Sequence, residues 1–194
     1  MICCLNPRCL NPLNADDAQN CRACGKPLTR LRGRYRTVEP LGQGGFGKTY
    51  LALDEDRLNT RCVIKQFSPQ LQGAKSLEKA IRLFNQEAIR LDELGEHAQI
   101  PTLLAYFEQE GFLYLVQQFI EGQSLFQEMR QQGAFTERQI RDVLSDILPV
   151  LRFIHKHQVI HRDITPSNIL RRPDGRLVLI DCGVAKQLND DPTA

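Results

Sequence analysis

The sequence has 194 residues, which is enough for one domain of medium size and a small appendage. Its composition, 42% hydrophobic and 25% charged, is typical of a globular protein, and no apolar run approaches the ~20 residues that a membrane-spanning helix needs. The N-terminus lacks the basic-then-apolar pattern of a secretory signal. We therefore expect a cytoplasmic protein without a membrane segment.

Charge is unevenly distributed along the chain. Residues 1–36 carry seven basic against two acidic side chains, a net charge of +5, whereas residues 37–194 carry 18 against 21, a net charge of −3. Such asymmetry indicates segments with different surroundings. We divide the chain into a cysteine-rich segment 1–28, a basic linker 29–36 and two further parts, 37–121 and 122–194.

The first segment contains five of the seven cysteines. Four of them, Cys4, Cys9, Cys21 and Cys24, form a Cys-x4-Cys and a Cys-x2-Cys pair separated by eleven residues. Two thiolate pairs on tight turns suit one tetrahedral zinc ion, and so short a segment has little else to fold around. The pattern predicts a zinc ribbon that is structural or binds a protein partner, because no ligand position is left open for catalysis.

Alternatives for this segment stay open. The thiols could be unrelated or paired as disulfides, and Cys3 could replace Cys4 as a ligand. Four arginines of the linker are compatible with nucleic-acid binding, but solvated arginines account for them equally well. They are Arg30, Arg32, Arg34 and Arg36. We favour a protein partner for the ribbon over a nucleic acid.

Beyond the linker, strand and helix patterns alternate. Alternating apolar residues and turn residues predict three strands, a hairpin and a later strand pair. Helical spacing predicts one helix before the hairpin and two after it, the last with a kink at Pro149. The expected strands are Thr37–Leu41, Thr49–Asp54, Arg61–Phe67, Leu103–Phe107, Phe112–Ile120, Ile169–Arg171 and Leu177–Ile180. The expected helices are Ser76–Leu94, Ser124–Gln131 and Thr136–Lys156. This order suits an α+β fold in two lobes.

A glycine-rich run, Gly42-Gln43-Gly44-Gly45-Phe46-Gly47, lies between the first two expected strands. Dinucleotide-binding folds use the same Gly-x-Gly-x-x-Gly spacing, but there the run leads into a helix, whereas here a strand pattern follows. A glycine-rich hairpin between strands can cover a nucleotide, with its N–H groups facing the phosphates. Gly44 and Gly47 would permit that close approach, and Phe46 would shield the phosphate from water.

Two charged residues lie in apolar surroundings. Lys65 follows three apolar residues of the third strand, so its ammonium group is expected at the rim of the core. Glu87 lies on the apolar side of the first helix, where an unpaired carboxylate is costly. We expect Lys65 and Glu87 to pair. The alternative is a Glu87 side chain that turns to solvent beside Arg90.

A third motif follows the longest expected helix. Asp163 comes after His161 and Arg162, with Asn168 five residues later and Asp181 thirteen further on. A carboxylate can accept the proton of an attacking hydroxyl, and carboxylate and amide oxygens suit Mg²⁺. The spacing indicates phosphoryl transfer.

Taken together, these motifs resemble the protein kinase signature set in order and spacing, over about Tyr35–Leu188. With four cysteines in front, the chain is similar to a group of serine/threonine kinases common in cyanobacteria. The resemblance implies a two-lobed, protein-kinase-like fold with a complete small lobe and an incomplete large lobe. It also implies transfer of the γ-phosphoryl group of ATP to serine or threonine hydroxyls of an unidentified protein substrate.

The resemblance also implies a role for each residue. Lys65 would grip the ATP phosphates and pair with Glu87, Asp163 would be the base, and Asn168 and Asp181 would hold Mg²⁺. The side chain at the back of the adenine pocket would be Gln117. The implied ATP contacts are Leu41, Gly42, Gln43, Gly44, Gly45, Phe46, Gly47, Thr49, Val63, Lys65, Gln118, Ile120 and Leu170.

Two substitutions depart from the family pattern. Thr165 stands where serine/threonine kinases have a lysine that reaches the γ-phosphate, and a neutral hydroxyl would lower the rate by ~10²-fold. Cys182 replaces a phenylalanine that packs beneath the helix of Glu87. The resulting gap would cost about 2–4 kcal/mol.

The sequence ends eleven residues after Gly183, with neither Ala-Pro-Glu nor an activation loop. We expect a C-terminally truncated kinase whose helix Thr136–Lys156 lacks part of its cover, which predicts association or marginal stability. The alternative function is a nucleotide-binding pseudokinase, or an inactive fragment whose working part is the ribbon. A nucleic-acid-binding ribbon beside a vestigial domain is the least favoured interpretation.

Overall fold

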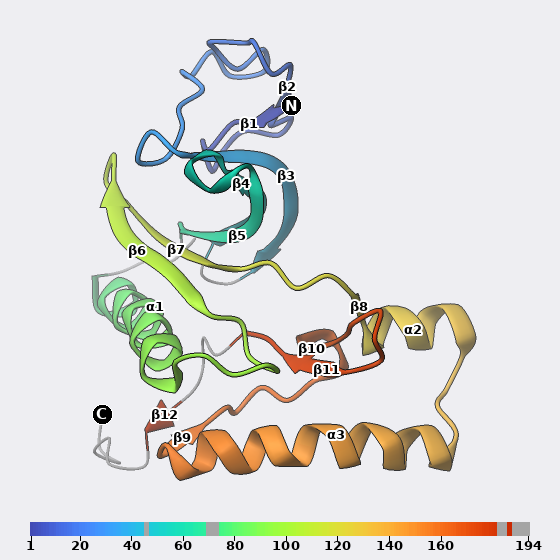
Figure 1. The fold of residues 1–194 in the computed structure, drawn as a ribbon. Helices are drawn as coiled ribbons and strands as arrows, with labels where there is room; N and C mark the ends of the chain where they lie inside the picture. Colours follow the sequence, from blue (N-terminus) through green and yellow to red (C-terminus); the bar gives the residue numbers. More distant parts are fainter. Residues whose placement is uncertain (45–46, 69–73, 182–185, 188–194) are drawn as a thin grey trace. The chain divides into compact units, whose positions relative to one another are not determined.

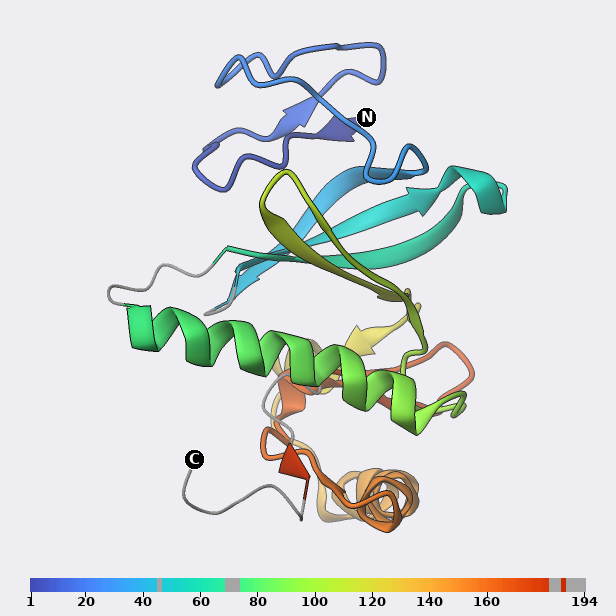
Figure 2. The ribbon, with the colours of Figure 1, turned by 90° about the vertical axis from the view of Figure 1, so that its left-hand side faces the viewer.

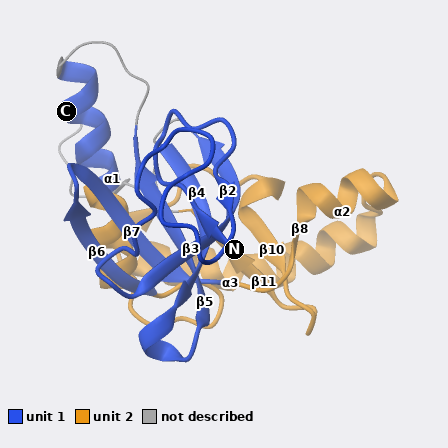
Figure 3. Cartoon of the chain, turned by 90° about the horizontal axis from the view of Figure 1, so that it is seen from above, with its two compact units in different colours: residues 1–84, 103–119 blue, residues 85–102, 120–194 orange. Residues whose placement is uncertain are grey.

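The computed structural model describes residues 1–44, 47–68, 74–181 and 186–187. Three residues singled out in the sequence, Gly45, Phe46 and Cys182, lie outside these ranges. The chain divides into two compact units (Figure 3). Unit 1 comprises residues 1–84 and 103–119, and unit 2 comprises residues 85–102 and 120–194.

The centre of unit 1 is a five-stranded antiparallel sheet (Figure 1). Its strand order is β3-β4-β5-β7-β6, so β7 pairs with β5 and β6 is an edge strand. The strands are β3 Tyr35–Gly44, β4 Gly47–Asp54, β5 Thr60–Phe67, β6 Leu103–Gln109 and β7 Phe112–Gln118. All five expected strands are therefore confirmed, with altered ends. The helix α1, Ala74–Leu94, begins in unit 1 and continues into unit 2.

The altered strand ends have local causes. β3 runs three residues beyond its expected end because the glycine-rich segment keeps pairing, up to Gly44 opposite Gly47. β6 and β7 meet at a two-residue turn, Glu110-Gly111, in which both residues have positive φ angles of 52° and 77°. Such a turn matches the twist of the flanking strands and lets pairing reach Gln109 and Phe112.

One face of the sheet carries the main core of unit 1. Its buried side chains come from every strand and from the segment before β3. They are Leu31, Tyr35, Ala52, Cys62, Ile64, Phe107, Tyr114 and Val116. Leu5 of the cysteine-rich segment packs against this cluster. The first segment thus covers a sheet face that would otherwise expose large apolar side chains.

The cysteine-rich segment folds back on itself and lies over the sheet (Figure 2). Its strands β1, Ile2–Cys3, and β2, Leu13–Asn14, form a small antiparallel pair. Thr37 Oγ1 on β3 donates a hydrogen bond to the carbonyl oxygen of Cys3 at 3.0 Å. Gln66 Nε2 on β5 donates to the carbonyl oxygen of Leu5 at 2.8 Å. These bonds attach the segment to two different strands.

The basic linker is partly buried, and most of its arginines are paired with carboxylates. Leu31 is 1% exposed, and the linker arginines bind acidic side chains on the short 3₁₀ helix η1, Glu55–Arg57, and around it. Arg30 and Arg36 both bind Glu55, at 2.7 and 2.8 Å. Arg34 binds Asp54. These ion pairs occupy three of the four arginines that suggested nucleic-acid binding.

Besides the end of α1, unit 2 contains α2, Leu125–Gln132, and α3, Glu137–Lys156. Each starts with a capping box, in which Ser124 or Thr136 exchanges hydrogen bonds with a glutamine three residues later. α3 continues through Pro149, and a kink there stays a prediction. Ile147, Val150 and Ile154 of α3 are buried, whereas three apolar side chains of the same helix are about half exposed. These are Ile140, Leu144 and Leu148.

Short strands complete unit 2. Strands β8 Gln123–Ser124, β10 Ile169–Arg171 and β11 Leu177–Leu179 form a sheet in the order β11-β10-β8. A second pair consists of β9 Val159–Ile160 and β12 Lys186–Gln187, and the 3₁₀ helix η2, Pro166–Asn168, precedes β10. Strands β10 and β11 confirm the expected strand pair. Among the described residues, no helix combines the length and apolar character needed to cross a membrane.

Candidate active site and metal centre

The aspartate and asparagine of the third motif are in direct contact. Asn168 Nδ2 donates a hydrogen bond to Asp163 Oδ2 at 2.8 Å and another to the Asp163 carbonyl oxygen at 3.1 Å. The short helix η2 makes this possible, since it turns the chain back within five residues. The amide nitrogen of Asn168 is thereby committed to Asp163, so its side-chain oxygen is the atom left to meet a cation.

Asp181 is held near this pair through the backbone. The Ile180 amide donates to the Asn168 carbonyl oxygen at 2.9 Å, and His161 Nε2 lies 3.2 Å from the Ile180 carbonyl oxygen. His161 is 1% exposed, and its Nδ1 accepts from the Asp163 amide at 3.3 Å. The buried imidazole therefore connects the turn of Asp163 to the strand end that precedes Asp181.

Two residues of this turn region have an unusual backbone conformation. Arg162 and Asp181 have φ angles of 66° and 65°, which non-glycine residues rarely adopt. Conformations of this kind cost of order 1–3 kcal/mol and cluster at functional sites. Other turns of this chain contain the same conformation, at Leu58, Asn59 and Glu110, so it is compatible with a functional role but does not by itself show one.

Two polar side chains, Asp146 and Gln99, hold the main chain of β11 in place. Asp146 on α3 accepts hydrogen bonds from the Leu177 amide at 2.6 Å and from Gln99 Nε2 at 3.1 Å. Gln99 Nε2 also donates to the Leu177 carbonyl oxygen at 3.0 Å, and the Leu179 amide donates to the Gln99 carbonyl oxygen at 2.9 Å. The strand that leads to Asp181 is thus fixed both by α3 and by the segment after α1.

Four residues expected around the nucleotide, Thr49, Val63, Lys65 and Gln117, share one face of the unit 1 sheet. Thr49 pairs with Lys65 across β4 and β5, and Val63 pairs with Gln117 across β5 and β7. Directly opposed residues of an antiparallel pair project from the same face, and alternation brings Val63 and Lys65 to that face too. The opposite face carries the buried core and the cysteine-rich segment.

Two described glycines of the run, Gly44 and Gly47, pair at the ends of β3 and β4. At Gly47 a Cβ atom would lie 1.9 Å from the Gln66 carbonyl oxygen and 2.7 Å from the Ser68 amide nitrogen. At Gly44 a Cβ atom would meet no atom within 4 Å. Gly47 is therefore required for the close packing of β4 on β5, a reason that the sequence did not indicate. The space beside Gly44 is compatible with a bound ligand.

The expected partners Lys65 and Glu87 lie in different units. Lys65 belongs to β5 in unit 1, and Glu87 belongs to the part of α1 in unit 2. Their pairing stays a prediction. Glu87 is 3% exposed, so the alternative in which its side chain turns to solvent is wrong. Arg90, suggested as its solvent-side neighbour, binds Glu93 at 2.8 Å.

The remaining residues of the expected ATP site are divided in the same way. Leu41 lies on β3 and is half exposed, and Gln118 ends β7, both in unit 1. Ile120 belongs to unit 2, as does Leu170, which lies on β10. The adenine pocket that these residues would form together stays a prediction.

Four thiols converge in the first segment. The Sγ atoms of Cys4, Cys9, Cys21 and Cys24 all lie within 4.8 Å of one another, with Cys4 and Cys24 3.5 Å apart and Cys9 and Cys21 3.7 Å apart. A tetrahedral zinc ion with ~2.3 Å bonds to sulfur separates its ligands by about 3.8 Å, so these thiols could hold such an ion. Among the described residues, no other group of three or more His, Cys, Asp or Glu side chains has this geometry.

Cys3 does not belong to the converging group. It lies on β1, is 1% exposed, and burial raises the pKa of its thiol to about 11. Its carbonyl oxygen is the one that Thr37 binds. The structure therefore favours Cys4 over Cys3 as the first ligand.

Sequence reasoning missed Gln66 as a connecting residue. Gln66 Nε2 donates to the Leu5 carbonyl oxygen and, at 3.1 Å, to the Tyr114 hydroxyl oxygen, and Gln66 is 1% exposed. The Tyr50 hydroxyl lies 3.4 Å from Gln66 Oε1. A polar residue directly after Lys65 in an apolar strand was the available signal, since alternation places it on the face opposite the lysine.

A five-stranded antiparallel sheet with one helix, followed by a helical unit with short strand pairs, defines a protein-kinase-like α+β fold. The protein kinase domain family model matches residues 35–194. The chain therefore belongs to the protein kinase family.

The chain is also similar to named bacterial kinases. It is 46% identical to serine/threonine-protein kinase B of Synechocystis sp. over 192 residues, which are 98% of this chain and 33% of that protein. It is 44% identical to serine/threonine-protein kinase F of the same organism, over 91% of this chain and 38% of that protein. Serine/threonine-protein kinase PknA of Nostoc sp. is 44% identical over 81% of this chain and 28% of its own length.

These alignments show how much of each relative the chain spans and whether the likeness includes residues before the family match. The chain spans about a third of the length of the curated relatives it matches. The alignment with kinase B covers 98% of the chain, so it includes the cysteine-rich segment. The likeness therefore extends beyond the kinase domain itself.

Proposed function

We propose that this chain binds ATP with Mg²⁺ and transfers the γ-phosphoryl group to a serine or threonine hydroxyl of a protein substrate. The observation that carries the proposal is the hydrogen bond from Asn168 Nδ2 to Asp163 Oδ2. It orients the carboxylate that would accept the hydroxyl proton, and it leaves Asp163 Oδ1 for that proton. The same bond turns the Asn168 side-chain oxygen away from Asp163 for metal binding.

The other residues take roles that their positions support. Asp181 and Asn168 would hold Mg²⁺, which would neutralise charge on the phosphates during transfer. Lys65 would hold the ATP phosphates and Glu87 would hold Lys65, while Gly42–Gly47 would cover them. Thr49 and Val63 share the face of Lys65, which supports their contact with adenine.

We also propose that zinc occupies the four-thiol group. Four sulfur ligands without an open position suit a structural zinc ion, which supplies folding energy rather than catalysis. The hydrogen bonds from Thr37 and Gln66 would make that folding energy available to the sheet. We propose a protein rather than a nucleic acid as the partner of this segment, because three linker arginines are bound to carboxylates.

The phosphoryl-transfer proposal is tested with purified protein, labelled ATP, Mg²⁺ and a mixture of protein acceptors. We expect phosphate incorporation that falls by ~10²–10⁴-fold in Asp163→Asn, because the substituted amide cannot accept the proton. Asp174→Asn, which changes an exposed aspartate in the turn before β11, is the matched control and should retain activity. Equal incorporation by wild type and Asp163→Asn would contradict the proposal.

A second candidate function is a pseudokinase that binds ATP without turnover. Thr165 favours it, because this neutral residue stands where the serine/threonine kinase pattern has a lysine that reaches the γ-phosphate. Thr165 precedes η2, and its carbonyl oxygen accepts from the Asn168 amide at 3.0 Å, so its backbone is fixed near the site. Thermal stabilisation by ATP without phosphate transfer identifies this function. In an active chain, Thr165→Lys is expected to raise the transfer rate by ~10-fold or more.

A further inference from the structure

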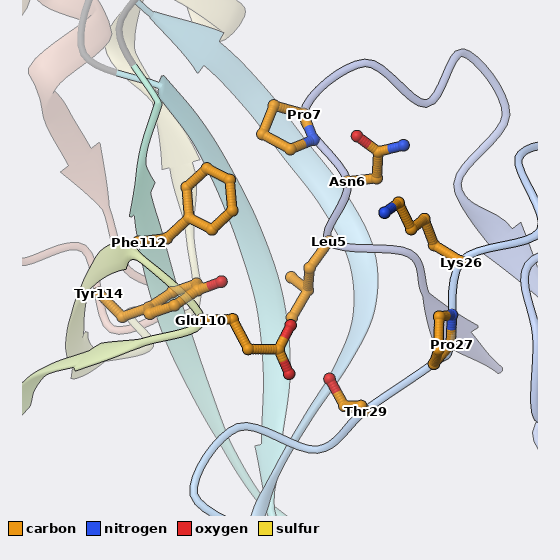
Figure 4. Close-up of a pocket in the computed structure, with 9 residues that line it drawn as sticks. All are labelled: Leu5, Asn6, Pro7, Lys26, Pro27, Thr29, Glu110, Phe112 and Tyr114. Carbon is orange, nitrogen blue, oxygen red and sulfur yellow. The ribbon is translucent and has the colours of Figure 1, made fainter.

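A cavity of about 500 Å³ lies within unit 1, between the cysteine-rich segment and the β6–β7 hairpin (Figure 4). Phe112 and Tyr114 line it from the strand side, and Pro7 and Pro27 line it from the cysteine-rich segment. Leu5 lies between the two sides. Its size falls within the ~300–1,000 Å³ typical of ligand sites, and four of its nine lining residues carry rings.

The two walls are fixed relative to each other. Tyr114 is 2% exposed, and its hydroxyl oxygen accepts from Gln66 Nε2, which also binds the Leu5 carbonyl oxygen. A single buried amide therefore joins both sides of the cavity. The Cys21 amide donates to the Lys26 carbonyl oxygen at 2.8 Å, which ties the rim of the cavity to the four-thiol group. The cavity is preformed, so a ligand would not need to order its walls.

Opposite charges lie at the rim. Lys26 projects from the cysteine-rich segment and Glu110 from the hairpin turn, and both side chains are exposed (Figure 4). No described ion pair joins them. Thr29 and Asn6 add polar groups beside these charges. An apolar centre with a polar, charged rim is the arrangement found at protein-recognition surfaces.

We propose that this cavity is a docking site for a short extended segment of a partner protein. The segment would insert one large apolar side chain into the apolar centre lined by Leu5, Phe112 and Pro27. It would carry an acidic residue toward Lys26 and a basic residue toward Glu110. The strand residues of the site, Phe112 and Tyr114, lie on the sheet face opposite Lys65. Docking is therefore separate from phosphoryl transfer, and its test does not depend on kinase activity.

The test uses the full chain, expressed with zinc in the medium, and fluorescein-labelled seven-residue peptides. The probes have the sequence Ser-Asp-Gly-Phe-Gly-Lys-Ser, its Ala-centred form, and two forms in which both charged positions are Asp or both are Lys. Fluorescence anisotropy measures each affinity. We expect the mixed-charge Phe peptide to bind at least fivefold more tightly than the other three.

Charge reversal gives the decisive comparison. Lys26→Glu should make the peptide with two Lys the best ligand, and Glu110→Lys should make the peptide with two Asp the best ligand. These expectations hold whichever direction the peptide runs. Arg22→Glu and Glu108→Lys are matched controls, because they reverse exposed charges on the same two segments outside the cavity. Both should keep the wild-type preference.

Zinc content and melting temperature confirm that each variant is folded before its affinities are compared. The proposal is overturned by three results: no binding of the Phe peptides, an unchanged charge preference in Lys26→Glu and Glu110→Lys, or an equal change in the two controls. None of these results bears on phosphate transfer, which the Asp163→Asn comparison tests separately.

Discussion

The glycines of the run 42–47 are required for different physical reasons. Gly47 has a φ angle of 146° and no room for a Cβ atom, because the backbone of β5 lies directly beside it. Gly44 and Gly42 have open space around them. Gly47 is needed for the packing of the sheet, whereas Gly42 and Gly44 leave a surface on which a ligand could lie.

Substitution of these glycines should separate folding from ligand binding. Gly47→Ala is expected to lower the free energy of unfolding by at least ~2 kcal/mol, since the methyl group must displace the β5 backbone. Gly44→Ala should change it by less than ~1 kcal/mol and instead weaken ATP binding. Urea unfolding and ATP titration measure the two effects. A Gly47→Ala protein as stable as wild type would contradict the packing role.

Glu55 connects the linker to the sheet through two arginines. The hydrogen bond from Arg30, with a further one from Arg36, holds the pKa of the Glu55 carboxyl below its usual value of 4.5. A carboxyl whose pKa is lower in the folded state stabilises that state above the unfolded pKa. The stabilisation disappears as the pH falls through the folded pKa.

Glu55→Gln should therefore destabilise the protein by about 1 kcal/mol at pH 7, and the difference from wild type should shrink as the pH falls below 4.5. Asp56→Asn is the control, because Asp56 is 65% exposed and its contact with Arg34 is 3.6 Å long. Urea unfolding over a pH series measures both. A difference that stays constant with pH would show that the charge of Glu55 is not responsible.

Secondary-structure elements of unit 2 are joined by polar side chains as well as by apolar packing. Asp146 on α3 and Gln99 after α1 both bind the main chain of β11. β11 ends two residues before Asp181. The position of the proposed magnesium ligand therefore depends on a carboxylate in the middle of a distant helix.

Asp146→Ala is expected to destabilise the protein by about 1.5–3 kcal/mol, because the Leu177 amide loses a charged acceptor. Hydrogen exchange at the Leu177 amide should accelerate in parallel. Asp142→Ala changes an exposed aspartate one turn earlier on α3 and should have little effect on either measurement. Equal effects of the two substitutions would exclude a specific role for Asp146.

The sequence predicted the secondary-structure elements better than the contacts between them. Strand and helix positions followed from local periodicity, so all seven expected strands and all three helices appear with small shifts at their ends. The convergence of the four thiols followed from their spacing, whereas the Mg²⁺ ligands stay a prediction. Packing of Leu31, the role of Gln66 and the bonds of Asp146 depend on residues far apart in the chain, and no local pattern encodes these contacts.

The cysteine-rich segment and the sheet form a single unit at the scale of the whole molecule. Leu5 fills part of the sheet core, and Gln66 and Thr37 bind the carbonyl oxygens of Leu5 and Cys3. Zinc binding is therefore expected to stabilise the sheet as well as the loops that carry the thiols.

Removal of zinc with a chelator should lower the melting temperature of the protein and increase hydrogen exchange in β3 and β5. Added zinc should restore both, and Cys21→Ser should reproduce the chelated state. Cys62→Ser changes a cysteine outside the four-thiol group and should not alter the zinc content. Hydrogen-exchange rates in β3 and β5 that do not change when the chelator is added would show that the cysteine-rich segment and the sheet fold independently.

The contacts of the linker have a practical meaning for anyone who shortens this protein. The kinase family match begins at residue 35, but Leu31 and Leu5 lie in or against the core of the same sheet. A version trimmed to the family boundary would uncover Tyr35, Phe107 and Tyr114 together and leave the Gln66 amide without its carbonyl partner. Such a protein should tend to aggregate, so the boundary drawn by homology is not a boundary at which the chain can be cut.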